Sequence, residues 1–199
     1  MLVAGPVRAD PVPCEQEIEL ARRFADVKTM RADFRDEKRI VLMEEPLVSQ
    51  GRILYLRPDR IRQDIERPSR QTLVIAGNRM SIRQHDLGKE QRFDVDSNPM
   101  MKAIVQNILL VLSGQVDRMV GQYRCLLTRD DEAYHLELTP LKEPMSKVMK
   151  SIRVAIGRDM KMREVVMEEA GGDVSRLTFT NVVHDQPFTD EEVKRHFTP

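Results

Sequence analysis

The most constraining feature of this sequence is a series of five short apolar-rich segments between residues 30 and 84, most of which alternate apolar and polar residues. A period of two is typical of β-strands, because successive side chains point to opposite faces of a sheet. Turn-forming residues separate the segments, among them Pro46, Pro58-Asp59, Pro68-Ser69 and Gly77-Asn78. The strands predicted in this way cover residues 30–43, 48–57, 61–66, 71–76 and 80–84.

The connections between these strands determine their relative direction. Each is too short to hold the crossover helix that parallel neighbours need, so the strands must pair in antiparallel fashion. We therefore predict an antiparallel meander.

One helix interrupts the strands. Asn98 can accept hydrogen bonds from open backbone N–H groups, and Pro99 suits the first helical turn, so a helix should begin here. It should end at Ser113-Gly114. Its second half is apolar on nearly all sides and must be covered on more than one side. It is therefore either an ordinary core helix or a lid over an apolar cavity.

The strand pattern resumes after this helix. We predict strands at residues 122–128, 133–138, 152–156, 162–167 and 176–183, with an irregular segment or short helix at 141–149. An amphipathic helix should precede the first strand, at residues 15–27, and a short helix should close the chain at 190–196. The predicted fold class is mainly β with helices (α+β).

Length and composition indicate one globular domain. The chain has 199 residues, of which 41% are hydrophobic. It contains no run of about 18 apolar residues, the length needed to span a membrane. We expect residues 1–13 to be an export-signal remnant or a disordered N-terminus, and residues 14–199 to form a single domain. Cys14 and Cys125 could form one disulfide in an oxidising compartment, and two separate buried thiols are the alternative.

The charge balance argues against nucleic-acid binding, because 32 Lys and Arg residues equal 32 Asp and Glu residues. The charges are nevertheless unevenly distributed. Residues 52–92 carry five more positive than negative charges, whereas residues 130–192 carry six more negative than positive charges. This pattern fits either solvated strand faces or a charged docking surface.

Sequence patterns typical of catalytic sites are scarce. The four histidines lie far apart, and there is no nucleophile elbow, phosphate-binding glycine loop or dinucleotide-binding motif. The two cysteines lack zinc-ligand spacing. We therefore expect no enzyme activity, no metal and no cofactor. Loss of turnover on replacing His85 or His135 would contradict this expectation.

Several weak motifs in a fixed order resemble the outer-membrane lipoprotein carrier family, the LolA-like periplasmic carriers. They are the stretches VKTMRADF at residues 27–34, PLVSQG at 46–51 leading to YLRP at 55–58, QTLVIAG at 71–77, LSG at 112–114, and GD at 172–173 before LTF at 177–179. The resemblance covers roughly residues 18–197. The chain departs from the family pattern in lacking tryptophan, with Gln63 and Ile82 in the neighbourhoods where such residues are common.

This resemblance implies an incomplete antiparallel β-barrel wrapped round lid helices. It also implies a periplasmic carrier that binds the acyl chains of a lipoprotein or glycolipid and shuttles them from the inner to the outer membrane. We expect this carrier to be a monomer. The implied partners are an inner-membrane exporter or ABC transporter and an outer-membrane receptor. Arg57 matches the family arginine that holds the lid closed. The alternative is a lipid-sensing regulatory module on the same fold.

On this interpretation, apolar strand and lid residues should line the acyl-chain cavity, although the sequence does not show which strand face points inward. Flexible methionines, of which the chain has 12, suit such a cavity and equally suit an ordinary core. The candidates are Phe34, Leu54, Leu56, Ile65, Leu73, Ile75, Met80, Met101, Ile104, Val105 and Ile108.

Overall fold

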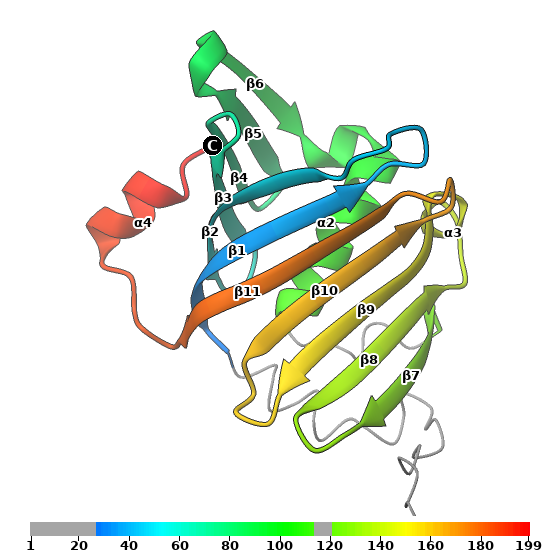
Figure 1. The fold of residues 1–199 in the computed structure, drawn as a ribbon. Coiled ribbons are helices and arrows are strands. Elements are labelled where there is room, and N and C mark those ends of the chain that lie inside the picture. The colour runs from blue at the N-terminus through cyan, green and yellow to red at the C-terminus, as the bar shows by residue number, and fades with distance from the viewer. Residues whose placement is uncertain (1–26, 114–120) are drawn as a thin grey trace, which may run out of the picture.

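A computed structural model describes residues 27–113 and 121–199 of the chain. The predicted export-signal remnant, Cys14 and nearly all of the predicted first helix lie outside the described residues. The described part is built on one antiparallel sheet with helices on both of its sides (Figure 1).

Eleven strands form this sheet among the described residues, and every neighbouring pair is antiparallel. The order across the sheet is β6-β5-β4-β3-β2-β1-β11-β10-β9-β8-β7. The strands are β1 (Thr29–Arg39), β2 (Leu47–Leu56), β3 (Arg60–Arg67), β4 (Gln71–Ala76), β5 (Arg79–Gln84), β6 (Lys89–Asp94), β7 (Tyr123–Arg129), β8 (Ala133–Pro140), β9 (Met149–Gly157), β10 (Met162–Glu169) and β11 (Val174–His184).

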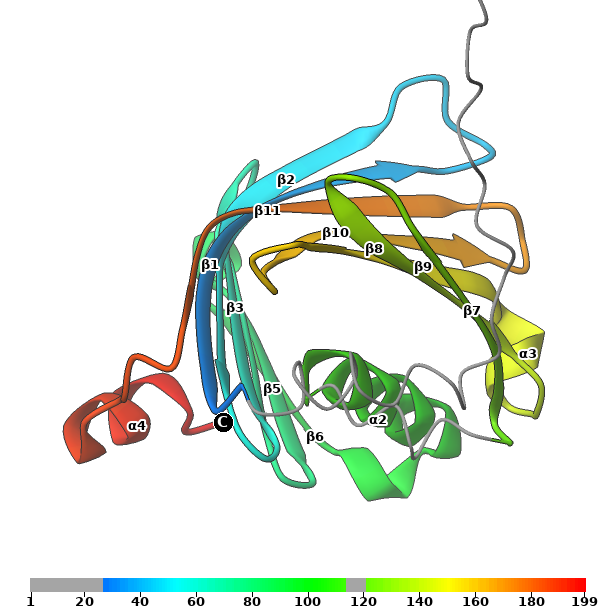
Figure 2. The ribbon, with the colours of Figure 1, turned by 90° about the horizontal axis from the view of Figure 1, so that it is seen from below.

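The sheet curves strongly but stays open. β6 and β7 are its two edge strands and do not pair with each other, so the barrel is incomplete (Figure 2). β1 lies in the middle, between β2 and β11, and joins the first meander to the second. The predicted fold class and the antiparallel meander are confirmed.

Two predictions about the strands need correction. The first strand ends at Arg39 rather than at residue 43, because the chain leaves the sheet there to turn back into β2. β6 was not predicted, because its sequence KEQRFD is mostly polar and all but one of its side chains are exposed. Pairing with β5, rather than hydrophobic patterning, makes this segment a strand.

The predicted middle helix is α2 (Pro99–Ser113). The Oδ1 atom of Asn98 accepts hydrogen bonds from the backbone N–H groups of Met100, at 2.9 Å, and Met101, at 3.1 Å. The predicted cap is therefore confirmed. The remaining helical segments are two 3₁₀ turns, η2 (His85–Leu87) and η3 (Val95–Ser97), and the short helices α3 (Met145–Val148) and α4 (Asp190–His196).

The helices lie on opposite sides of the sheet. α2 lies on the concave side, whereas α4 lies against the convex side of the first strands (Figure 2). A capping box between Thr189 and Glu192 begins α4. The main hydrophobic core therefore lies between the concave face and α2, which contributes Val105 to the buried cluster.

Candidate functional site

The concave face of the first meander presents apolar side chains in rows that cross the strands. Residues paired on neighbouring antiparallel strands share a face, so the pairing register shows which side chains form each row. One row is entirely apolar apart from a single hydroxyl, and it consists of Met30, Tyr55, Ile61, Ile75, Met80 and Phe93. The next row consists of Ala32, Ile53, Gln63, Leu73 and Ile82.

The second meander continues this surface. Phe34 of β1 pairs with Phe179 of β11, which carries the apolar face across the centre of the sheet. Two further rows extend to the β7 edge. They are Leu177, Val165, Val154, Leu136 and Leu127, and Ser175, Met167, Ile152, Leu138 and Cys125. The concave face is thus apolar over both halves of the sheet.

α2 covers this face with one part of its apolar surface. Val105 is only 4% exposed, and Met101 and Leu109 pack against the same core cluster. Ile104 and Ile108, one helical turn apart, keep 41% and 38% of their surfaces exposed. The apolar arc of the helix is therefore wider than the stripe that the core buries.

The structure separates the predicted cavity residues by face. Five predicted strand residues share the concave face, namely Phe34, Ile65, Leu73, Ile75 and Met80. Leu54 and Leu56 lie on the opposite face, which corrects their grouping with the other five. Leu54 pairs with Arg31 and Arg62, outside the core cluster.

Sequence reasoning missed the residues that hold the inward positions of β2 and β3, which are Ile53, Tyr55 and Ile61. In β2 both faces carry large apolar residues, so alternation separates the two sets without showing which set points inward. Tyr55 is fully buried, and its hydroxyl has no hydrogen-bond partner among the described residues. Burial raises the pKa of Tyr55 to about 12, although the charge of Arg57 acts in the opposite direction.

Arg57, the predicted latch residue, directly follows β2. Its backbone N–H donates to the carbonyl oxygen of Lys28 at 2.9 Å, which joins the end of β2 to the chain just before β1. The residue is exposed. Its proposed role in holding a lid stays a prediction.

Polar groups occupy the end of the concave face nearest the β1–β2 connection. Asp36 lies two residues after Phe34 on β1, so its side chain points to the same face of the sheet. Its Oδ1 atom is buried, and no group in residues 27–113 or 121–199 forms a hydrogen bond with it. Burial raises the pKa of this carboxyl, against the effect of Lys38. Lys38 itself donates to Glu169 at 2.8 Å.

The described residues contain neither a cluster of metal ligands nor a membrane-spanning helix. No group of three or more His, Cys, Asp or Glu residues in the described part of the chain is arranged to hold a metal ion. No helix within residues 27–113 and 121–199 is both long and apolar enough to cross a membrane. Cys125 is disulfide-bonded, and the sequence holds one other cysteine, Cys14.

The solved structures that are similar to this chain include the following three. A LolA superfamily protein from Nitrosomonas europaea is 14% identical, with coverage of 94% of this chain and 98% of that chain and a TM-score of 0.49. A DUF1329 family protein from Desulfovibrio piger is 12% identical, with coverage of 89% and 95% and a TM-score of 0.50. The MucA/MucB complex of Pseudomonas aeruginosa matches at 16% identity, with coverage of 90% of this chain, 59% of that chain and a TM-score of 0.54.

The last two similarities show a shared fold, and the MucA/MucB match spans less than two thirds of the other chain. None of the curated proteins matches this chain. The model of one family, described as outer membrane lipoprotein carrier protein LolA, matches residues 25–195, which include every described strand and almost all of α4. On this match, and with the open antiparallel sheet that the sequence resemblance implied, the chain belongs to the LolA family of outer membrane lipoprotein carrier proteins.

Proposed function

We propose that this protein is a periplasmic carrier that binds acyl chains between α2 and the concave face of the sheet. The observation that supports this most directly is the apolar surface on both sides of that boundary. The sheet offers continuous apolar rows, and α2 offers Ile104 and Ile108, which the core leaves partly exposed. An acyl chain packed against Ile104 and Ile108 would cover apolar surface that the protein alone leaves in contact with water.

The energetics suit a carrier that must also release its cargo. Each buried CH₂ group contributes about 0.8 kcal/mol, so two long acyl chains gain on the order of 20 kcal/mol in gross transfer. Separating α2 from the concave face must offset much of this gain. We propose that Arg57 takes part in holding the closed state, because charge-assisted contacts are strong enough to matter and still reversible.

The cargo in this proposal is a lipoprotein or another acylated envelope molecule, such as a glycolipid. An inner-membrane exporter, such as an ABC transporter, supplies it, and an outer-membrane receptor accepts it. The disulfide at Cys125 supports an oxidising compartment such as the periplasm. The family to which the chain belongs supports lipoprotein-related cargo in general.

The first test is native mass spectrometry of the protein purified from an envelope-competent host, followed by titration with a fluorescent acyl probe. We expect Ile104→Asp and Ile108→Asp to weaken probe binding by about tenfold or more, because a bound chain would desolvate the new charge. Both positions are exposed enough to tolerate the substitution without the probe. Gln106→Asp is the matched control on an exposed position of the same helix.

Val105→Asp provides the contrasting case, because Val105 is 4% exposed and a charge there should unfold the protein. If Ile104→Asp and Ile108→Asp behave like Val105→Asp, α2 is an ordinary core helix. A wild-type protein that carries no lipid and refuses the probe would refute the proposal. A protein that binds the probe but never transfers it between vesicles would instead support the lipid-sensing module.

A further inference from the structure

The connection between β1 and β2 exposes a concentrated set of apolar side chains. We call residues 40–46 the β1–β2 tip. Val41, Leu42 and Met43 are 65%, 94% and 47% exposed, and the adjoining Leu47 is 49% exposed. Elsewhere in the described part of the chain, exposed large hydrophobic residues occur singly along the sequence. Leaving three consecutive apolar side chains in water is unfavourable, which points to a binding role for this segment.

The tip is held in a defined position. The N–H of Met43 donates to the carbonyl oxygen of Ile40 at 2.9 Å, which closes a turn. The N–H of Val41 donates to the carboxylate of Asp173 at 3.0 Å, and this bond attaches the tip to the β10–β11 turn. Figure 2 shows the connection extending past the paired parts of β1 and β2, on the side of the sheet away from α2. Binding through this tip would therefore require little additional ordering.

A second segment at this end of the sheet carries one further exposed apolar side chain. The N–H of Ala170, in the β10–β11 turn, donates to the carbonyl oxygen of Val148 at the end of α3. The chain leading into α3 carries Leu141, which is 54% exposed. The tip, the β10–β11 turn and the α3 segment are thus joined at one end of the molecule (Figure 1).

The chemistry of the tip favours a lipid bilayer over a protein partner. Its apolar residues are aliphatic, whereas protein-binding hot spots are rich in tryptophan and tyrosine. The tip is a turn between two strands, which suits insertion among lipid chains rather than reception of a partner's side chain. Its flanking charges balance, with Lys38 and Arg39 against Glu44 and Glu45. Attraction to an oppositely charged partner is therefore not its source of affinity.

We propose that the β1–β2 tip inserts its aliphatic side chains into the interfacial region of a lipid bilayer. Docking would bring the polar end of the concave face, at Asp36 and Lys38, close to the membrane surface. The inference goes beyond the proposed carrier function, because the tip can bind vesicles whether or not acyl cargo occupies the concave face.

The absence of tryptophan from the chain permits a direct test. Leu42→Trp introduces a single fluorescent reporter at the tip, and Leu87→Trp is the matched control at a residue of η2 that is 64% exposed. We expect phosphatidylcholine vesicles to shift the emission of the Leu42→Trp protein to shorter wavelength and to leave that of the control unchanged. Phosphatidylglycerol and added salt should change the shift little, because the flanking charges balance.

Vesicle flotation then measures affinity with the native tip. Leu42→Asp should lower the bound fraction by about tenfold or more, whereas Leu87→Asp should not lower it. Leu42→Gln should give the same direction of change without a new charge, and circular dichroism should show both variants folded.

Three results would overturn the inference: wild-type protein that does not float with vesicles, equal flotation of wild type and Leu42→Asp, or an equal loss in Leu87→Asp. A concentration-dependent dimer that Leu42→Asp abolishes, seen by sedimentation, would assign the tip to a second copy of this chain instead.

Discussion

Asp36 shows how a single residue on the concave face carries an electrostatic cost. It lies on β1 next to Phe34 on the same face, and its Oδ1 atom is buried without a partner. Burial raises its pKa above the ordinary value of 3.8, because the charged form loses hydration. The contribution of this carboxyl to stability is therefore present below pH 3.8 and is lost as the pH rises through the folded-state pKa.

Asp36→Asn is accordingly expected to raise the free energy of unfolding at pH 7, with a gain that disappears below about pH 4. Urea unfolding at both pH values measures this difference. Glu37→Gln is the control on the opposite face, where Glu37 makes exposed ion pairs of 3.8 Å and 3.6 Å with Arg35 and Arg39. Loss of stability at pH 7 in Asp36→Asn would show that attraction to Lys38 outweighs burial.

Gly51 marks a close approach of two strands. A Cβ atom at this position would lie 1.8 Å from the backbone carbonyl oxygen of Asp64, so no side chain fits unless β2 and β3 separate. Gly51→Ala should therefore lower the free energy of unfolding by about 3 kcal/mol or more. Gly171→Ala, where nothing lies within 4 Å, should be close to neutral in the same denaturant titration. Equal stability of the two variants would contradict the observed strand spacing.

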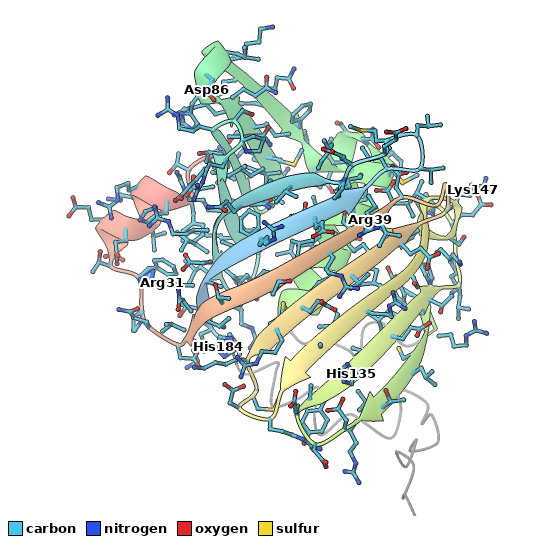
Figure 3. All side chains as sticks on the ribbon, viewed as in Figure 1. Arg31, Arg39, Asp86, His135, Lys147 and His184 are labelled. Atoms are coloured by element: carbon cyan, nitrogen blue, oxygen red, sulfur yellow. The ribbon has the colours of Figure 1, made fainter. Side chains whose placement is uncertain are left out.

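At the scale of single elements, α4 is attached to the convex side of the sheet through Arg31 (Figure 3). The guanidinium carbon of Arg31 lies 3.7 Å from the ring centroid of Phe188, and its Nη2 atom lies 3.6 Å from Glu192. Thr29 adds a hydrogen bond of 2.9 Å from its hydroxyl to the carbonyl oxygen of Gln186. The planar, charged guanidinium of Arg31 thus joins both Phe188, before α4, and Glu192, within α4, to β1.

Removing this contact should loosen α4 and spare the sheet. In Arg31→Ala we expect hydrogen exchange of residues 186–197 to speed up by about tenfold, while β1 to β4 keep their protection. Arg31→Lys should rescue exchange only in part, since an ammonium group cannot stack as a guanidinium does. Faster exchange throughout the sheet would mean that Arg31 supports the whole fold instead.

The elements themselves were largely predictable from local sequence. The strand at residues 71–76 and the helix at residues 190–196 match β4 and α4, and Asn98 begins α2 as expected. Turn residues, caps and alternation act over a few neighbouring positions, which is why they are readable in sequence. β6 was missed, and residues 41–43 were wrongly assigned to the first strand, because strand pairing and chain reversal, rather than hydrophobicity, determine their structure.

At the scale of the whole molecule, the middle of the sheet joins distant parts of the chain. β1 pairs with β11, whereas the edges come from β6 and β7, on either side of α2 along the chain. Cys125 lies on the β7 edge strand and is disulfide-bonded. Since Cys14 is the only other cysteine in the sequence, peptide mapping without reductant should find Cys14 linked to Cys125.

A link across so long a stretch of chain should restrict the unfolded state substantially. We expect reduction, or the pair of substitutions Cys14→Ser and Cys125→Ser, to lower the free energy of unfolding by roughly 4 kcal/mol in a denaturant titration. Both single serine variants should lose about as much as the pair. Recovery of both residues as free thiols from the oxidised protein would contradict this prediction.

The sequence by itself determined most of the strands, their antiparallel pairing, the helix start at Asn98 and the family resemblance, because these depend on patterns that are local or ordered along the chain. Only the tertiary structure decided which face of β2 is buried. Ile53 and Tyr55 point inward and Leu54 and Leu56 point outward. The register places the first pair on the face that also carries Met30, Ala32 and Ile61. Side-chain alternation is the same whichever face is covered, so the covering helix and the curvature of the sheet had to supply that choice.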